Sequence, residues 1–174
     1  MKPDLFRVAL IGPESTGKTT LCTQLSEHYN TCWVPEFARE YIKSLNRPYT
    51  KDDIIFCAEK QIETEALLIS KANKILFSDT ELIICRVWLI NVFGACTEWI
   101  DKKIMENKYD LYLLTLPDIP FIEDAVRENP NRRQYFFDWY KVELKKRKLK
   151  FEIVDGLKEV RLKNAFEIIN RVYC

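Results

Sequence analysis

The sequence contains a single histidine and only four glycines among 174 residues. His28 has no cysteine or second histidine at the spacing that zinc sites use, so we expect no zinc centre. Few glycines and 47% hydrophobic residues exclude a fibrous or disordered chain and leave enough apolar side chains for a buried core. The length corresponds to one compact domain over residues 1–174.

The chain also lacks an excess of charge of either sign and any long hydrophobic run. Lys and Arg total 27 against 26 Asp and Glu, which disfavours a protein that coats nucleic acid or an anionic membrane. The most apolar window, 82–93, includes Arg86 and is shorter than the roughly 20 residues that span a bilayer. We find no export signal, so we expect a cytoplasmic protein without nucleic-acid or membrane partners, whose six cysteines stay reduced.

Five short apolar runs alternate with helical patterns along the chain. Because each run is followed by a helix, the pattern predicts an α/β fold in which helices cover both faces of a five-stranded parallel sheet. The predicted strands are residues 5–11, 32–34, 74–79, 110–117 and 151–156. The first predicted helix begins near residue 19. The others cover residues 50–69, 81–106 with a break near Gly94, 131–147 and the end of the chain from about residue 162.

The helix predicted over 50–69 has a clear start. Thr50 can cap it, and two aspartates in its first turn favour the positive end of the helix dipole. Apolar residues at intervals of three and four predict its buried stripe. This stripe would contain Ile55, Ala58, Ile62, Ala66 and Ile69.

Residues 12–19, Gly-Pro-Glu-Ser-Thr-Gly-Lys-Thr, match the phosphate-binding pattern GxxxxGK[ST] in full. The glycines allow a tight turn in which backbone N–H groups point at phosphate oxygens, next to the positive end of the following helix. Lys18 supplies charge for the β- and γ-phosphates, and the Thr19 hydroxyl can ligate Mg²⁺. We predict that ATP and Mg²⁺ bind here, the nucleotide through Gly12, Pro13, Glu14, Ser15, Thr16, Gly17, Lys18, Thr19 and Thr20.

A GTPase is the less favoured interpretation of this loop. The string Asn107-Lys108-Tyr109-Asp110 fits the base-reading pattern NKxD, but it precedes a predicted strand, whereas the GTPase motif follows one. Asp79 also lacks the glycine that a switch turn needs. A preference for ATP over GTP remains open from the residues alone.

Two acidic residues lie at or just after the carboxyl ends of predicted strands, where parallel sheets bind their ligands. Asp79 ends an apolar strand and is a candidate for holding Mg²⁺ together with Thr19. Glu36 can accept or orient the proton of an acceptor hydroxyl, and Arg39 and Glu40 follow it at helical spacing. The sequence does not decide whether Glu36 or Asp79 is the base. The presence of both acids favours a catalytic protein over a non-catalytic P-loop switch, because a protein that only binds nucleotide needs no base beside an acceptor.

The segment 117–133 carries three prolines and mixed charge, which predicts a loop or lid. Its Arg127, Arg132 and Arg133 can bind the phosphoryl group in transfer while the lid excludes water. The later run Lys145-Lys146-Arg147-Lys148 lies at a predicted helix end and is expected to be a solvated face.

The segments GPESTGKTTL, PEFAREY, Asp79-Thr80-Glu81 and EDAVR together resemble a known family. They are similar to the ribosylnicotinamide kinase domain of the bacterial nicotinamide-nucleotide adenylyltransferase/ribosylnicotinamide kinase, in the AAA-like P-loop ATPases, from Gly12 to about Arg133. The resemblance implies a P-loop nucleoside-kinase-like fold and transfer of the ATP γ-phosphoryl to the 5′-hydroxyl of nicotinamide riboside. It implies catalytic roles for Lys18, Glu36, Asp79 and Arg127, and substrate binding by Glu36, Arg39, Glu40 and Asp124.

One position departs from the family. Its members have a tryptophan directly before the glutamate, where this chain has Pro35, and Trp33 lies two residues earlier. An aromatic ring there is suited to stacking on a pyridine. The resemblance makes nicotinamide riboside the expected acceptor. Because Pro35 replaces the aromatic residue, another nucleoside or nucleotide is the alternative.

Overall fold

The computed structural model describes residues 5–123 and 129–173, and its centre is a parallel sheet of five strands. The strand order is β2-β3-β1-β4-β5, and every neighbouring pair is parallel. This confirms the predicted α/β class, and each strand lies within its predicted range. The strands are β1 (Phe6–Ile11), β2 (Trp33–Val34), β3 (Ile75–Asp79), β4 (Leu111–Thr115) and β5 (Phe151–Val154).

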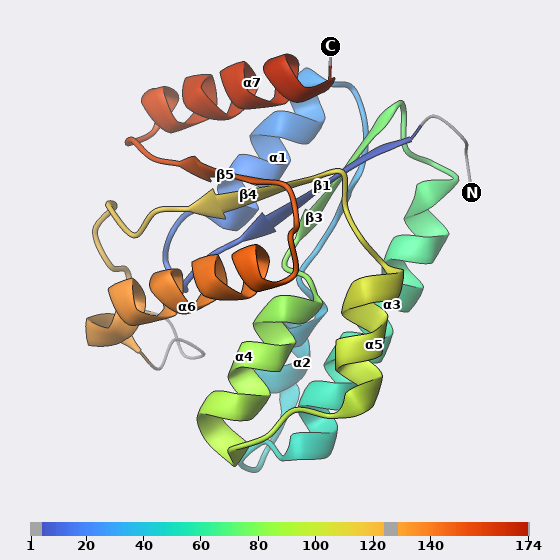
Figure 1. Ribbon diagram of the computed structural model, residues 1–174, viewed down its shortest axis with the longest axis vertical. Helices are drawn as coiled ribbons and strands as arrows, with labels where there is room; N and C mark the ends of the chain where they lie inside the picture. The colour runs from blue at the N-terminus through green and yellow to red at the C-terminus, as the bar shows by residue number, and fades with distance from the viewer. Residues whose placement is uncertain (1–4, 124–128, 174) are drawn as a thin grey trace.

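Helices cover both faces of the sheet in a three-layer arrangement (Figure 1). One face packs against α1 and α7, and the other packs against α3, α4, α5 and α6. The predicted break near Gly94 is present, because this residue ends α4 with φ at 78°. The helices are α1 (Lys18–His28), α2 (Phe37–Ser44), α3 (Lys51–Ile69), α4 (Leu82–Phe93), α5 (Glu98–Glu106), the short 3-10 helix η1 (Pro130–Arg132), α6 (Arg133–Lys146) and α7 (Glu159–Tyr173).

The middle strand, β1, shows why the strand segments carry apolar residues facing both sides of the sheet. In β1, Val8 and Leu10 belong to the core beneath α1 and α7, while Ala9 and Ile11 belong to the core on the opposite face. All four side chains are fully buried. A parallel strand covered on both faces needs apolar residues at successive positions, which is the pattern that the sequence carries here.

The buried face of α3 differs from the predicted stripe. Ala66 is exposed, and the helix buries Gln61 and Glu65, at 5% and 3% exposure, in its place. Both polar side chains form hydrogen bonds inside the protein, so their burial costs little. The residues that face inward are Asp53, Ile54, Cys57, Ala58, Gln61 and Glu65.

The start of α3 is a capping box that also holds α2. Asp53 accepts hydrogen bonds from the Thr50 backbone N–H at 2.7 Å, the Tyr41 hydroxyl at 2.8 Å and the Arg47 guanidinium at 2.6 Å. These contacts, led by the Arg47 bond, hold the pKa of the Asp53 carboxyl well below its usual range. A depressed pKa in the folded state stabilises the fold above the unfolded-state pKa, and this contribution disappears as the pH falls.

We therefore expect Asp53→Asn to lower the melting temperature at pH 7 by several degrees. The difference from the wild type should shrink below about pH 4, where the unfolded carboxyl also binds a proton. Circular dichroism melts between pH 7 and pH 3 measure this, with Asp52→Asn as the control on an exposed neighbour. A difference that stays constant with pH would contradict the proposed origin of the stability.

The NKYD segment has a structural role far from the phosphate loop. Asn107 accepts a hydrogen bond from Arg7 at 2.8 Å, and the Tyr109 hydroxyl donates to Glu65 at 2.7 Å. The Asp110 carboxylate accepts the backbone N–H of Arg7 at 2.7 Å. The segment lies at the amino end of β4, whereas the phosphate loop follows the carboxyl end of β1, so it is not positioned to read a base in that loop.

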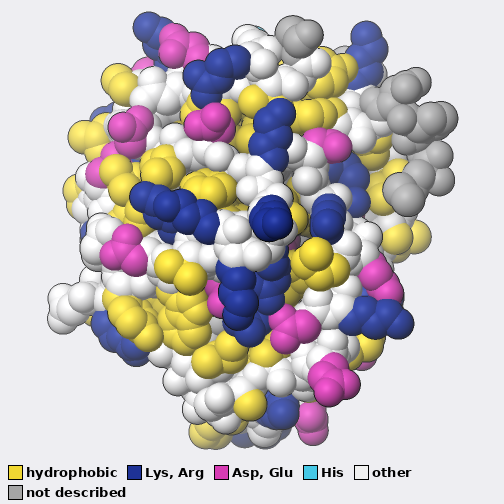
Figure 2. All heavy atoms as spheres, in the orientation of Figure 1, with side chains coloured by type: hydrophobic (Ala, Val, Ile, Leu, Met, Phe, Trp, Pro, Cys, Tyr) yellow, Lys and Arg dark blue, Asp and Glu magenta, His cyan; other side chains and the backbone are white. Residues whose placement is uncertain are grey.

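The surface mixes charges of both signs. Figure 2 shows Lys and Arg side chains near the centre of one face, around the turn from α6 to β5, with acidic side chains nearby. The predicted solvated run there is only partly correct, because the Arg147 side chain is mostly buried and pairs with Asp101 at 2.7 Å and with Glu143. Within the described residues, no helix has the length and apolar character to cross a bilayer. The described cysteines are all free thiols.

Candidate functional site

The phosphate-binding loop follows β1 and leads into α1. Gly12 has φ at 153°, and a Cβ at this position would lie 2.2 Å from Oγ1 of Thr115 in β4. A side chain would therefore push the loop away from the sheet. Gly17, with φ at 77°, stands at the N-cap of α1, so the backbone turns directly from the loop into the helix. The two glycines place the loop across the positive end of α1.

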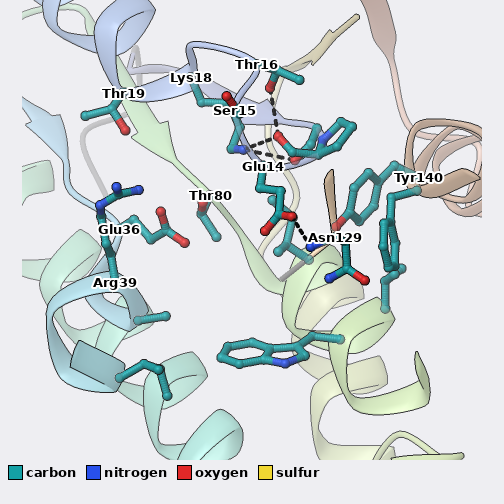
Figure 3. Close-up of a pocket in the computed structure, with 18 of the residues that line it drawn as sticks. Glu14, Ser15, Thr16, Lys18, Thr19, Glu36, Arg39, Thr80, Asn129 and Tyr140 are labelled. Atoms are coloured by element: carbon teal, nitrogen blue, oxygen red, sulfur yellow. Dashed lines mark hydrogen bonds between the residues drawn. The ribbon is translucent and has the colours of Figure 1, made fainter. Parts of the chain in front are cut away.

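Lys18 and Thr19 occupy the first turn of α1. The Lys18 Nζ donates to the carbonyl oxygens of Gly12 and Pro13, at 3.0 Å and 2.8 Å, so the ammonium group lies over the loop (Figure 3). Thr19 is directed towards the sheet, where its Oγ1 donates to Oδ2 of Asp79 at 2.5 Å. The charge and the hydroxyl required by the sequence motif are thus both at the loop.

Residues from distant segments brace the loop. The Thr16 hydroxyl contacts the Thr115 hydroxyl at 2.7 Å. Arg161, at the start of α7 and only 4% exposed, donates to the carbonyl oxygens of Thr16 at 3.1 Å and of Leu116 at 3.0 Å. Burial lowers the pKa of this guanidinium. Arg161 could not be predicted from the sequence, because no motif separates it from the other charged residues of an amphipathic helix.

Asp79 is the last residue of β3 and is fully buried. Burial raises the pKa of its carboxyl, and the nearby charge of Lys18 opposes this shift. Its Oδ1 atom and the hydroxyl of Thr80 are buried with no hydrogen-bond partner among the described residues. Oxygen atoms without partners beside a threonine hydroxyl are suited to a hard cation, so the residues present fit Mg²⁺.

The start of α2 forms one wall of a cavity of about 240 Å³ that is continuous with the loop. Glu36 precedes α2 without capping it, and both Glu36 and Arg39 line the cavity (Figure 3). Gln61 of α3 fixes this wall, because its side chain accepts the Phe37 backbone N–H at 3.0 Å and donates to the Asp79 carbonyl at 3.4 Å. Gln61 therefore links the glutamate wall to the strand that carries Asp79.

Aromatic and aliphatic side chains line the part of the cavity beyond the loop and α2. The rings of Tyr49 and Trp88 meet edge to face at 5.0 Å, and the Trp88 indole N–H donates to the Tyr49 hydroxyl at 3.2 Å. Burial raises the pKa of Tyr140, and the negative charges of Glu36 and Glu14 raise it further. The remaining apolar lining consists of Ala38, Ile42, Ile84, Val87, Val92 and Phe136.

The cavity supplies a tryptophan from an unexpected position. Trp33 does not line it, because this residue packs in the core on the face of α1 and α7. Pro35 is exposed. Trp88 reaches the cavity from α4, inside the apolar window that the sequence analysis used only to exclude a membrane span. Tyr49, Tyr140, Asn91 and Asn129 also line the cavity without having been predicted.

Several predicted site residues do not face the cavity. The Glu40 side chain is 80% exposed and pairs with Lys43 at 3.6 Å. Arg133 donates to the carbonyl oxygens of Ser15 and Ile119, at 3.2 Å and 2.8 Å, and so links the phosphate loop to the segment that follows β4. Arg132 donates to Asn91 at 3.0 Å, at the rim. The predicted roles of Asp124 and Arg127 lie outside the described residues.

A parallel sheet whose first strand leads through GxxxxGKT into a helix, with a buried aspartate ending the adjacent strand, defines a P-loop nucleotide-binding protein. The comparison with family models agrees with this class. A model described as an AAA domain matches residues 7–161, and the chain belongs to this family.

The relatives indicate a narrower group. The trifunctional NAD biosynthesis/regulator protein NadR of Salmonella typhimurium is 29% identical over 134 residues, which cover 73% of this chain and 32% of NadR. A crystal structure of a NadR protein in complex with NR matches with a TM-score of 0.84 and 26% identity, covering 98% of this chain and 51% of that one. The chain thus spans about a third to a half of these NadR chains.

A thymidylate kinase from Candida albicans matches with a TM-score of 0.65 and 15% identity, covering 98% of this chain and 94% of that one. At this identity the match describes the fold alone, and it agrees with the three-layer α/β arrangement around a parallel sheet. The fold expected from the family resemblance is therefore confirmed.

Proposed function

We propose that this protein is an ATP-dependent kinase that transfers the γ-phosphoryl group to the 5′-hydroxyl of nicotinamide riboside. The observation that carries the proposal is one continuous cavity with a phosphate-binding loop at one end and carboxylates and aromatic rings beyond it. The NadR proteins, one of which was crystallised with NR, support the choice of acceptor.

The loop end of the cavity suits the triphosphate. Backbone N–H groups of residues 12–19 and the N-terminus of α1 would bind the phosphate oxygens, and Lys18 would move from the loop carbonyls to the β- and γ-phosphates. Thr19 and Asp79 would hold Mg²⁺, which when bound neutralises charge on the phosphoryl oxygens. Positioning and charge neutralisation account for most of phosphoryl-transfer catalysis, so these residues would carry most of the rate.

The opposite wall suits the acceptor. Glu36 would accept a hydrogen bond from the 5′-hydroxyl and orient it towards the γ-phosphate, since it lines the cavity beside the loop. Arg39 would stabilise negative charge on the group in transfer. Gln61 would keep Glu36 in place relative to Asp79.

The base of the acceptor would bind against the aromatic wall. A nicotinamide riboside carries a positive charge on its pyridine ring, and aromatic faces attract such a cation. Glu14 and Glu36 add negative charge to the same cavity, since both raise the pKa of Tyr140. We propose that Trp88 takes the stacking role that the family tryptophan has at the position of Pro35.

We expect Trp88→Ala to raise the KM for nicotinamide riboside by about tenfold or more, because an aromatic–cation contact in a desolvated site contributes roughly 2 kcal/mol. The KM for ATP should change less than twofold, and Trp88→Phe should keep most of the affinity. Steady-state kinetics with each substrate varied in turn gives these values. Trp99→Ala serves as the matched control, since Trp99 belongs to α5, packs against the same hydrophobic core and does not line the cavity. Equal losses for ATP and acceptor would contradict the assignment.

The function itself is tested with a panel of acceptors. The purified protein is incubated with ATP and Mg²⁺ and with nicotinamide riboside, thymidine, deoxyadenosine or thymidylate, and the phosphorylated products are identified by mass spectrometry. The expected result is nicotinamide mononucleotide as the main product. If only a different acceptor is phosphorylated, the assignment of nicotinamide riboside as substrate is wrong. Nucleotide binding without phosphorylation of any acceptor would indicate a P-loop switch.

A further inference from the structure

Thr80 directly follows β3, and its backbone conformation is unusual for its residue type. Its φ is 80°, in the left-handed region that glycine favours, whereas a β-branched side chain is rarely found there. Hydrogen bonds on both sides fix this conformation. The Thr80 N–H donates to the Leu10 carbonyl of β1 at 3.2 Å, and the next residue, Glu81, caps α4. A costly conformation of this kind persists where the surrounding structure imposes it, and it is common at functional sites.

The Thr80 hydroxyl is buried and has no hydrogen-bond partner in the part of the chain that the structure describes. The residue is 4% exposed, and it lines the cavity that joins the phosphate loop to the start of α2. A hydroxyl that loses water without gaining a protein partner destabilises the fold. The proposed Mg²⁺ site explains the buried oxygen of Asp79, but it does not require the Thr80 hydroxyl. This hydroxyl is therefore suited to donate to a ligand in the cavity.

The order of the strands determines which part of the reaction Thr80 faces. β3 lies between β1, which leads into the phosphate loop, and β2, which leads to Glu36. Ser78 of β3 pairs with Val34 of β2. Thr80 and Glu36 are each two residues further along, and in the view of Figure 3 Thr80 lies between Glu36 and the loop. A phosphoryl group that moves from the loop to a hydroxyl beside Glu36 would therefore pass the end of β3.

We propose that the Thr80 hydroxyl donates a hydrogen bond to an oxygen of the phosphoryl group in transfer, which makes Thr80 a further catalytic residue. In this step the 5′-oxygen of the acceptor bonds to the γ-phosphorus, the bond from this phosphorus to the β–γ bridging oxygen breaks, and ADP leaves with the electron pair. The proton of the acceptor hydroxyl leaves along its hydrogen bond to Glu36. Thr80 forms no covalent bond and stabilises the charge from a fixed position. The inference rests on the proposed kinase function and adds a residue to the same site.

Thr80→Val tests this role, because valine keeps the branched shape and removes the donor. A hydrogen bond to a charged group contributes more than a neutral one, so kcat should fall by about 10- to 100-fold. The KM values for ATP and for the acceptor should stay within about twofold, because the contact is made in the transition state. Thr80→Ser keeps the hydroxyl and should retain most of the rate. Thr64→Val is the matched control, since the Thr64 hydroxyl donates to the Lys60 carbonyl within α3, away from the cavity.

A binding measurement separates this role from one in folding or in metal binding. In isothermal titration calorimetry, the affinity of Thr80→Val for AMP-PNP with Mg²⁺ should stay within about twofold of the wild-type value. ADP with aluminium fluoride mimics the phosphoryl group in transfer, and in the presence of the acceptor it should bind about 10- to 100-fold more weakly to the variant. The thermal melt should show no loss of stability, because the substitution removes a buried hydroxyl that has no partner among the residues described.

A rate of Thr80→Val near that of the wild type would overturn the inference, and so would equal losses of affinity for AMP-PNP and for ADP with aluminium fluoride. Activity that returns at high Mg²⁺ would overturn it as well, because the hydroxyl would then belong to the metal site. Failure of the wild type to phosphorylate any acceptor would instead overturn the proposed function, and the inference with it. Measuring the wild type first therefore distinguishes the two failures.

Discussion

Lys18→Ala should reduce the rate of phosphoryl transfer by about 10³-fold or more while the protein remains folded. Removal of a single preorganised donor from a transition state costs on the order of 10² to 10³ in rate, and this donor also carries a full charge. The fold should tolerate the change, because among the described residues Lys18 donates to the loop carbonyls of Gly12 and Pro13 alone, and it lies partly exposed in the first turn of α1.

A coupled assay for ADP measures the rate, and a circular dichroism melt checks the fold. Lys60→Ala is the matched control, because Lys60 lies on α3 in an exposed pair with Glu63. Turnover of Lys18→Ala near the wild-type rate would refute the phosphate site, since Lys18 is the loop residue proposed to contact the β- and γ-phosphates directly.

Asp79→Asn and Glu36→Gln should both reduce turnover by about 10² or more, but they should respond differently to magnesium. Asp79 has a buried Oδ1 atom without a partner among the described residues and an Oδ2 atom bound to Thr19, so its loss should weaken metal binding. A higher Mg²⁺ concentration should restore part of the activity. The loss in Glu36→Gln should not be restored, because the group that orients the acceptor hydroxyl is missing.

Rates measured across a Mg²⁺ titration separate the two roles and decide which acid is the base. Rescue of Glu36→Gln by Mg²⁺, with no rescue of Asp79→Asn, would reverse the assignments. Mg²⁺ dependence unchanged from the wild type in both variants would remove the metal site from β3 altogether.

The strands and the phosphate loop could be predicted because their signals are local. A strand buried on both faces must be apolar at successive positions, as Val8 to Ile11 are, and the loop geometry depends on residues next to one another in the sequence. The same locality explains the errors in α3. Apolar spacing favoured Ala66 over Glu65, although the buried position belongs to the glutamate, whose partners Arg7 and Tyr109 come from distant segments.

The acceptor wall could not be predicted for the same reason. Trp88 and Tyr140 lie at helical positions that are typical of a core, and only the packing of α4 and α6 places them at the cavity. Glu40, in contrast, was predicted to lie in the site but does not. Its place in the PEFAREY segment suggested substrate binding, but one helical step carries it to the outer surface of α2, while Arg39 remains inside.

The contact between Arg161 and Thr16 has a consequence for synthesis of the protein. The loop near residue 16 leaves the ribosome long before the helix that braces it, and the buried guanidinium reaches Thr16 only after α7 has begun to form. A nascent chain that ends before residue 161 therefore carries the whole motif without one of its supports. Nucleotide binding should therefore mature only after α7 has left the ribosome, when this helix packs beside α1 on the same face of the sheet.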